Sequence, residues 1–224
     1  MEKNAGSAGI FAKNNARKRC ACVAGMLQLS CTQKPASHDR QNGSKRCHGK
    51  GDFGMKVAMI GHKDFPSRSG GVEVMVGGLA TSLVKRGYEV TVYNRGLQKG
   101  HNVYTADGVQ ARRIFTFKKA ALNAMVYSFL ATFDALIRNY DVIHYHAIGP
   151  SVPLVIAKLF GKHTVCTVHG LNWKVDKWGG FASAYLRLGE RVAAKYADDL
   201  VVLSESEWNY FDEKYNRSAI LIPN

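Results

Sequence analysis

Apolar residues follow two alternating patterns along the chain from residue 55 onward. Short, continuously apolar runs predict buried strands, and longer stretches with apolar residues at three- and four-residue steps predict amphipathic helices. The second predicted helix shows this spacing well, because Leu122, Met125, Phe129 and Phe133 fall on one face. The predicted strands are 56–60, 89–93, 113–117, 142–145, 164–168, 200–203 and 219–222, and the predicted helices are 72–86, 119–138, 151–160, 181–196 and 205–214.

The alternation of strands and helices indicates the fold class. Strands that are apolar throughout suit a parallel sheet that is buried on both faces, and the helices between them would supply the two covering layers. We therefore predict an α/β domain with a doubly wound, Rossmann-like parallel sheet over residues 55–224. In such sheets ligands bind beyond the carboxyl ends of the strands, so the loops that follow strands are the candidate sites.

Residues 1–54 show neither pattern and are rich in Lys, Arg, Asn, Gly and Ser, which predicts a disordered basic leader. They hold ten Lys/Arg and three Asp/Glu, and so carry half of the net charge of +14. Because the first strand begins at Met55, one hypothesis is that the leader is upstream sequence and not native. A signal peptide, a zinc site of its four cysteines and a nucleic-acid contact are less favoured, because the spacings and patterns of each are incomplete.

The remaining composition suits a globular protein, with 46% hydrophobic and 21% charged residues. No apolar run reaches the length of a membrane span. Cys166 is the only cysteine after residue 54, and it lies in an apolar run typical of a core position. A domain that cannot close its own disulfide fits a reducing compartment, so we expect a cytoplasmic protein.

The loop after the first predicted strand ends in Gly70 and Gly71, at the start of a predicted helix. Glycines there let backbone N–H groups approach a ligand, and the positive end of the helix dipole favours an anion such as a phosphate or diphosphate. The structural alternative is that Gly70 caps the helix and Glu73 completes a pair resembling a capping box. Both interpretations can hold together.

Two later strand ends carry histidines. His144 and His146 alternate on one strand and therefore share a face, where they are either structural or at the rim of a pocket, since no third metal ligand is suggested. His169 follows the next strand beside a glycine. The amide, indole and amine of Asn172, Trp173 and Lys174 come directly after it, and such groups bind sugars and phosphates. A strand end with a packed tryptophan is the structural alternative.

A nicotinamide-dinucleotide site is disfavoured by the same loops. The Gly-x-Gly-x-x-Gly motif is absent, and the loop after the first strand is too long for that tight turn. The second strand ends at Asn94 and Arg95 in place of the usual acidic ribose ligand. Arg95 could meet only a 2′-phosphate, which leaves a dinucleotide-dependent oxidoreductase as the weakest alternative.

These loops, in this order, resemble the family-4 retaining glycosyltransferases of the GT-B fold, across residues 55–224. A more particular stretch, from His169 to Gly179 and from Tyr185 to Glu190, is similar to the bacterial rhamnosyltransferase-like branch that builds surface polysaccharides. The motifs that carry the family resemblance are Phe65-Pro-Ser-Arg-Ser-Gly-Gly-Val-Glu73, Asp141-Val-Ile-His-Tyr-His146, Thr167-Val-His-Gly170, Asp199-Leu-Val-Val-Leu-Ser204 and Ile222-Pro-Asn224.

The resemblance implies roles for individual residues. Gly70 and Gly71 would present N–H groups to the donor diphosphate. His169 would be catalytic, stabilising charge at the reacting sugar as the nucleotide leaves. Arg68, Asn172, Trp173 and Lys174 would line the acceptor side. No metal and no cofactor besides the nucleotide-sugar substrate is expected.

The resemblance also implies that residues 55–224 are the acceptor-side half of a hexosyltransferase. The C-terminal donor-binding domain is expected beyond Asn224 or on a separate chain, so the chain alone should be inactive. The acceptor would be a saccharide or lipid-linked saccharide, and Lys118 and Lys119 beside aromatic residues suggest peripheral contact with the inner face of the membrane. Nucleic acid is not an expected partner. The alternative is a non-catalytic remnant or partner subunit that binds sugar or phosphate.

Overall fold

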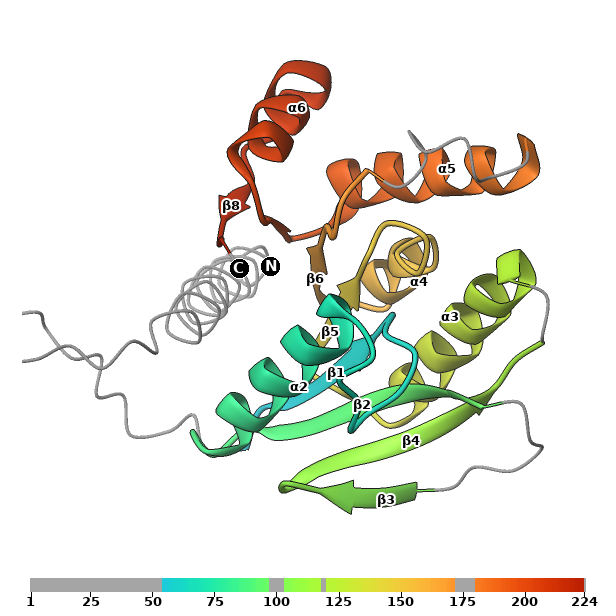
Figure 1. The fold of residues 1–224 in the computed structure, drawn as a ribbon, viewed down its shortest axis with the longest axis vertical. Helices are drawn as coiled ribbons and strands as arrows, with labels where there is room; N and C mark the ends of the chain where they lie inside the picture. Colours follow the sequence, from blue (N-terminus) through green and yellow to red (C-terminus); the bar gives the residue numbers. More distant parts are fainter. Residues whose placement is uncertain (1–53, 97–102, 118–119, 172–179, 224) are drawn as a thin grey trace, which may run out of the picture.

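A computed structural model describes residues 54–96, 103–117, 120–171 and 180–223, which form one α/β domain (Figure 1). Strands and helices alternate over most of this length, as the sequence predicts. The strands are β1 (Lys56–Ile60), β2 (Glu89–Gly96), β3 (Val103–Ala106), β4 (Val109–Phe115), β5 (Val142–His146), β6 (His163–Thr167), β7 (Asp199–Val202) and β8 (Ile220–Leu221). The helices are α2 (Gly71–Val84), α3 (Ala120–Ile137), α4 (Leu154–Leu159), α5 (Gly180–Tyr196) and α6 (Glu205–Tyr215).

The described strands form one sheet in the order β3-β4-β2-β1-β5-β6-β7-β8. Every neighbouring pair is parallel except β3 with β4. The order turns back at β1, which lies between β2 and β5, so the chain winds outward from the centre in both directions. This arrangement confirms the predicted doubly wound fold, and it places the ends of β1, β5 and β6 next to one another.

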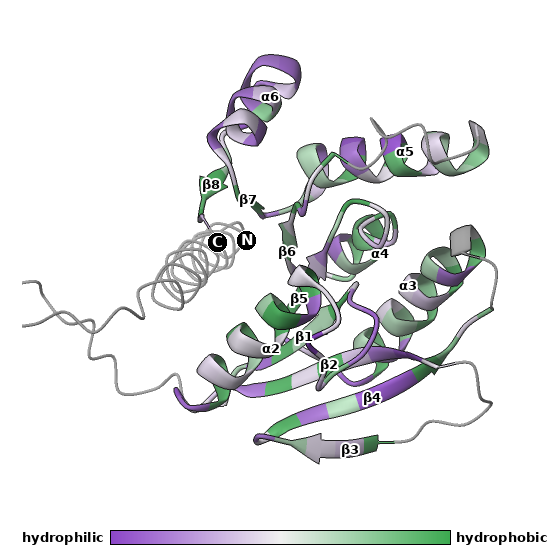
Figure 2. Cartoon of the chain, in the orientation of Figure 1, coloured by the Kyte–Doolittle hydropathy of each residue, from purple (hydrophilic) through white to green (hydrophobic). Residues whose placement is uncertain are grey.

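Helices cover both faces of the sheet (Figure 1). Along β1 the side chains alternate, with Val57 and Met59 in the core beneath α2. Ala58 and Ile60 belong to the opposite core, which α3, α4, α5 and α6 share. Figure 2 shows the corresponding distribution, because α2 and α3 carry mostly hydrophobic residues whereas α6 is mostly hydrophilic. Because both faces of the sheet are buried, the strands consist of continuous apolar runs.

The antiparallel hairpin of β3 and β4 was not predicted. A strand was expected at 113–117, but β4 begins at Val109 and is preceded by β3. The two strands meet at Asp107 and Gly108, whose φ angles of 50° and 77° form a tight left-handed turn. An Asp-Gly pair between two strands is a strong hairpin signal, because both turn positions need positive φ.

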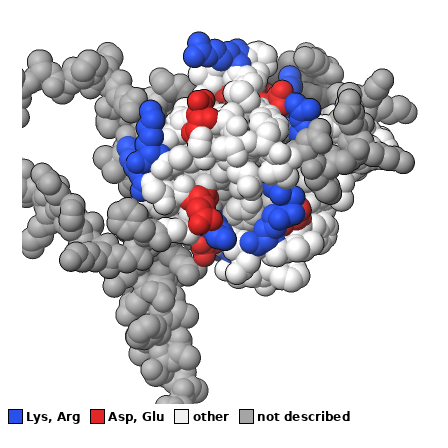
Figure 3. Space-filling view, turned by 90° about the horizontal axis from the view of Figure 1, so that it is seen from below, with Lys and Arg blue, Asp and Glu red and all other residues white. Residues whose placement is uncertain are grey.

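Several expectations from composition can be compared with the described residues. Cys166 is fully buried, as expected for a core position. No described helix is long and apolar enough to cross a membrane. On the face seen in Figure 3, Lys and Arg lie in small separate clusters, some beside Asp and Glu, and form no continuous basic surface. The leader, apart from its last residue, lies outside the described residues.

Candidate functional site

Three adjacent parallel strands turn sharply where they reach the candidate site. The residues after β1 and β5 are Gly61 and Ala147, with φ angles of 133° and 79°, and Gly170 near the end of β6 has a φ of 94°. A Cβ at Gly61 would lie 2.1 Å from the carbonyl oxygen of His146, so only glycine allows the two backbones to approach this closely. Ala147 carries a Cβ, and a positive φ at a non-glycine residue costs about 1–3 kcal/mol. Strain of this kind concentrates at functional sites.

The predicted phosphate-binding glycines open α2. Gly70 is the N-cap, its carbonyl accepts from the amide of Val74, and no side chain caps the first turn. A Cβ at Gly71 would meet no atom within 4 Å, so this position faces open space. The first-turn amides therefore lie where a ligand could reach them, and the phosphate-binding role of the glycine pair stays a prediction.

Glu73 corrects the capping-box interpretation. Its Oε1 accepts from the amide of Lys63, 3.3 Å away, rather than from the cap residue. Its Oε2 lies over Gly70, where a Cβ would come within 2.4 Å. Glu73 is buried, with a relative exposure of 7%, so one carboxylate ties the loop after β1 to the first turn of α2.

Histidines line the neighbouring strand ends. The rings of His144 and His146 are 4.1 Å apart between centroids, which confirms that they share a face. His144 Nε2 lies 2.8 Å from Thr167 Oγ1, within hydrogen-bonding distance. His146 Nδ1 lies 3.4 Å from Nε2 of His169, which follows β6. His169 is only half-buried, so the row leads from the core to the surface.

Burial keeps these imidazoles neutral. It lowers the pKa of His144 to about 3 and the pKa of His146 well below its usual value, with His169 nearby adding to both shifts. The pKa of His169 is lowered to about 4 by burial, against a smaller opposing effect of the Glu73 carboxylate. At neutral pH His169 thus acts as a neutral hydrogen-bonding group.

A fourth histidine, His62, is held by Asn94 at the end of β2. Asn94 Nδ2 donates to the carbonyl of Phe65 at 2.8 Å and lies 2.7 Å from the hydroxyl of Tyr104. The Asn94 oxygen is therefore turned toward His62 Nε2, 2.8 Å away, which must carry the proton. Burial lowers the pKa of His62 to about 4. The network holds the loop after β1 against the sheet.

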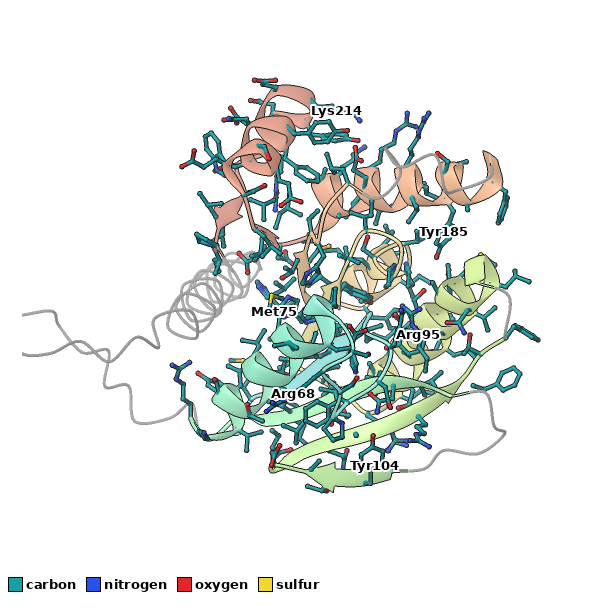
Figure 4. All side chains as sticks on the ribbon, in the orientation of Figure 1. Arg68, Met75, Arg95, Tyr104, Tyr185 and Lys214 are labelled. Atoms are coloured by element: carbon teal, nitrogen blue, oxygen red, sulfur yellow. The ribbon has the colours of Figure 1, made fainter. Side chains whose placement is uncertain are left out.

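Arg95 turns inward at the end of β2 (Figure 4). Its Nη2 donates to the carbonyl of Gly61 at 2.8 Å, and its Nη1 donates to Asn123 Oδ1 at 3.2 Å. The guanidinium also lies 5.2 Å from the ring centre of Tyr127, whose hydroxyl accepts from the Gly61 amide. Arg95 thus braces the Gly61 turn, and these bonds leave it poorly placed for the 2′-phosphate of a dinucleotide.

Contacts between the loops bring the predicted groups together. Glu73 at the start of α2 accepts from Lys63 on the loop after β1, and Arg95 on β2 donates to the carbonyl of Gly61 directly after β1. A Cβ at Gly61 would meet the carbonyl of His146, whose ring nitrogen lies 3.4 Å from that of His169 after β6. The start of α2 and the ends of β1, β2 and β6 therefore meet in one place.

Of the four predicted acceptor residues, the structure describes only Arg68. Arg68 is exposed on the loop before Gly70 (Figure 4). Asn172, Trp173 and Lys174 lie outside the described residues, as do Lys118 and Lys119. In the described ranges no three His, Cys, Asp or Glu side chains are grouped to hold a metal ion.

Sequence reasoning missed three residues of this site: His62, Asn94 and Arg95 in its bracing role. A signal was present, because each lies within three residues of the end of a predicted central strand. Their partners, however, come from β3 and α3, and the sequence alone did not reveal β3. Glu73 was noted only as a capping residue.

The family comparison matches the chain over residues 69–224 to the model named Glycosyltransferase Family 4. The matched region contains Gly70, Gly71 and the site histidines His144, His146 and His169. No curated protein matches the chain by sequence.

Solved structures show the same fold. Sucrose-phosphate synthase from Thermosynechococcus elongatus superposes with a TM-score of 0.63 at 17% identity, over 75% of this chain and 48% of that chain. A second structure of that enzyme, from a twinned crystal, gives a TM-score of 0.52 at 14% identity, over 76% of this chain and 88% of that one. The chain thus spans about half the length of the first of these structures, and its fold is that of a GT-B glycosyltransferase domain.

Proposed function

The chain belongs to glycosyltransferase family 4, and from this premise we propose that it is the acceptor-side half of a retaining hexosyltransferase. It would move a sugar from a nucleotide-sugar donor to a saccharide or lipid-linked saccharide. The observation that carries the proposal is that the open α2 start and His169 lie at one edge of the sheet, where Glu73 bonds to the loop after β1, Gly61 abuts His146, and His146 lies beside His169. Sequence similarity to the rhamnosyltransferase-like branch supports a bacterial surface polysaccharide as the product.

Sugar transfer would require two things of the residues at this edge of the sheet. Transfer breaks the bond between the anomeric carbon and a diphosphate oxygen and forms a bond to an acceptor oxygen, whose proton passes to the diphosphate after it has departed. The departing diphosphate gains negative charge, and the amides of Gly71 and the next residues would donate to it. His169, neutral at pH 7, would donate a hydrogen bond near the reacting sugar.

The experiment is His169→Ala in a protein completed with a family-4 donor domain, assayed against a panel of nucleotide sugars. We expect kcat to fall about 10²–10³-fold with the fold unchanged, because one charge-stabilising donor is lost. The matched control is His163→Gln at the opposite end of β6, which keeps a donor to Asp199, now 2.7 Å from His163 Nε2. Near-normal turnover of His169→Ala would refute its catalytic role.

We also propose that the chain does not turn over by itself. The chain covers 48% of the sucrose-phosphate synthase chain, and transfer requires donor carbon and acceptor oxygen to be held together at near-attack distance. A nucleobase pocket would come from a second domain or a separate chain. Sustained transfer by residues 55–224 alone would contradict this proposal, whereas binding of sugar or phosphate without transfer in the completed protein would favour a non-catalytic remnant.

Peripheral membrane contact is the proposed means of reaching a lipid-linked acceptor. Leu130, Phe133 and Ile137 form an exposed stripe on α3, with relative exposures of 42%, 46% and 84%. The stripe follows the basic pair at 118–119, and apolar and basic groups together suit an anionic bilayer.

The test of membrane contact is co-sedimentation with vesicles of phosphatidylglycerol and phosphatidylcholine, compared with phosphatidylcholine alone. Phe133→Ser should reduce binding to the anionic vesicles. Leu159→Ser is the control, because Leu159 is exposed at the end of α4 and lies off the α3 stripe. Equal binding by all three proteins would contradict membrane contact through α3.

A further inference from the structure

His146 stands behind His169 and is fixed from several sides. Its ring lies against that of His144, tilted by 32°, and His144 is itself within hydrogen-bonding distance of Thr167. Its carbonyl abuts Gly61, and the strained residue Ala147 follows it. His146 is fully buried, and its Nδ1 is 3.4 Å from His169 Nε2. A ring held this firmly can fix the orientation of its neighbour.

The protonation states limit what the two rings can share. Both are neutral, so each carries one proton and has one bare nitrogen. Of the two nitrogens that face each other, one must donate and the other must accept. His169 Nε2 faces inward to His146, which leaves His169 Nδ1 as the nitrogen available to a ligand.

We propose that His146 is a positioning residue that donates from Nδ1 to His169 Nε2 and thereby holds His169 as the tautomer with a proton on Nδ1. A group that stabilises developing negative charge must present a donor to the ligand, and only this tautomer does so from Nδ1. The inference rests on the proposed role of His169. Beyond that role, it is His146 that determines which ring nitrogen of His169 donates.

His62 is excluded as the residue that sets this tautomer. Its proton is committed to Asn94 through Nε2, so its remaining nitrogen can only accept. His144 lies within hydrogen-bonding distance of Thr167, and its ring contact is with His146. Among the described residues near His169, His146 is the one whose ring nitrogen lies within hydrogen-bonding reach of it.

The experiment is ¹⁵N NMR of the imidazole nitrogens in the full 224-residue chain at pH 7. We expect His169 to be protonated on Nδ1 with a bare Nε2. His146→Leu should convert His169 to a mixture of tautomers, and His146→Asn, whose amide can take the place of Nδ1, should restore the original state. His144→Asn is the control, because it removes the ring that lies against His146 and leaves the His146–His169 contact in place.

Two results would overturn the proposal. The first is a wild-type His169 protonated on Nε2, and this measurement decides the matter even if the leucine variant fails to fold. The second is an unchanged His169 tautomer in a folded His146→Leu protein. Neither result depends on turnover, so failure of the positioning role is distinguishable from failure of the transferase proposal. In the completed enzyme, His146→Leu should lower kcat by about 10²-fold with little change in KM, and His146→Asn should recover most of that loss.

Discussion

Replacement of Gly71 by valine tests the phosphate site while leaving the domain itself undisturbed. A Cβ at this position meets no atom within 4 Å, so the folded protein has room for the side chain. A ligand at the first-turn amides of α2 would have no room for it, because the branched side chain would stand between the backbone and the phosphate. The expected result is therefore weaker anion binding at unchanged stability.

The magnitude follows from the bonds at risk. A hydrogen bond to a charged group contributes about 1.5–3 kcal/mol, and each 1.4 kcal/mol is a tenfold change in affinity. Loss of one amide-to-phosphate bond should thus weaken binding about 10- to 100-fold. Valine and glycine differ by only a few tenths of a kcal/mol in helix propensity, so Tm should shift little.

The assay is titration of the ¹⁵N-labelled chain with inorganic pyrophosphate, following the amide signals of Gly70 and Gly71. Gly78→Val is the matched control, because Gly78 lies on the same helix and also faces open space. It should bind like the unmodified chain. Equal affinity of the Gly71 and Gly78 variants would refute the phosphate site and leave Gly71 as a structural residue at a helix start.

Three further predictions concern charge. Asp134→Ala should lower the free energy of unfolding by about 3–5 kcal/mol in urea, because it leaves the guanidinium of Arg112, 7% exposed, without its partner 3.1 Å away. Arg138→Ala removes an exposed partner of the same carboxylate and should cost less than about 1 kcal/mol. Stability should fall as pH drops from about 6.5 to 4, because the pKa of His62 is depressed from 6.5 to about 4 in the folded state and the unfolded chain binds the proton first. This group alone accounts for about 3 kcal/mol, and urea titrations of His62→Gln should show a shallower loss. Glu73→Gln should tighten pyrophosphate binding by about three- to tenfold at low salt, because it removes a like charge near the α2 start. Binding that is unchanged by Glu73→Gln would show that the carboxylate does not influence the anion.

The sequence predicted those parts of the fold that depend on local periodicity. The central strands are apolar on both faces and bounded by helices of clear 3.6-residue period, so β1, β5 and β6 were predicted within one or two residues of their ends. The β3–β4 hairpin was missed because β3 lies at the sheet edge and is only partly buried, so its pattern is weak. The Asp107–Gly108 turn between them was the usable signal.

The candidate site was predictable in position but not in its contacts. His169, Gly70 and Gly71 were chosen as candidates because ligands bind where parallel strands end and helices begin, and their roles stay predictions. That Glu73 would bond to Lys63, or that Asn94 would fix His62, depends on side-chain geometry across elements distant in sequence. Such contacts have no local pattern that a single sequence could display.

Several features at the ends of the strands destabilise the fold, and they help to decide between a catalytic site and a non-catalytic remnant. Ala147 is held at positive φ, and within the described residues two buried ring nitrogens, His62 Nδ1 and His146 Nε2, have no hydrogen-bond partner. Each feature costs about 1–3 kcal/mol, a substantial share of the 5–15 kcal/mol that stabilises a typical domain. The fold alone does not require the first and last of these features, since a glycine at 147 would remove the backbone strain and an apolar residue at 146 would remove one unpaired nitrogen. Their presence at the strand ends, beside His169 and the open start of α2, favours an arrangement retained for chemistry.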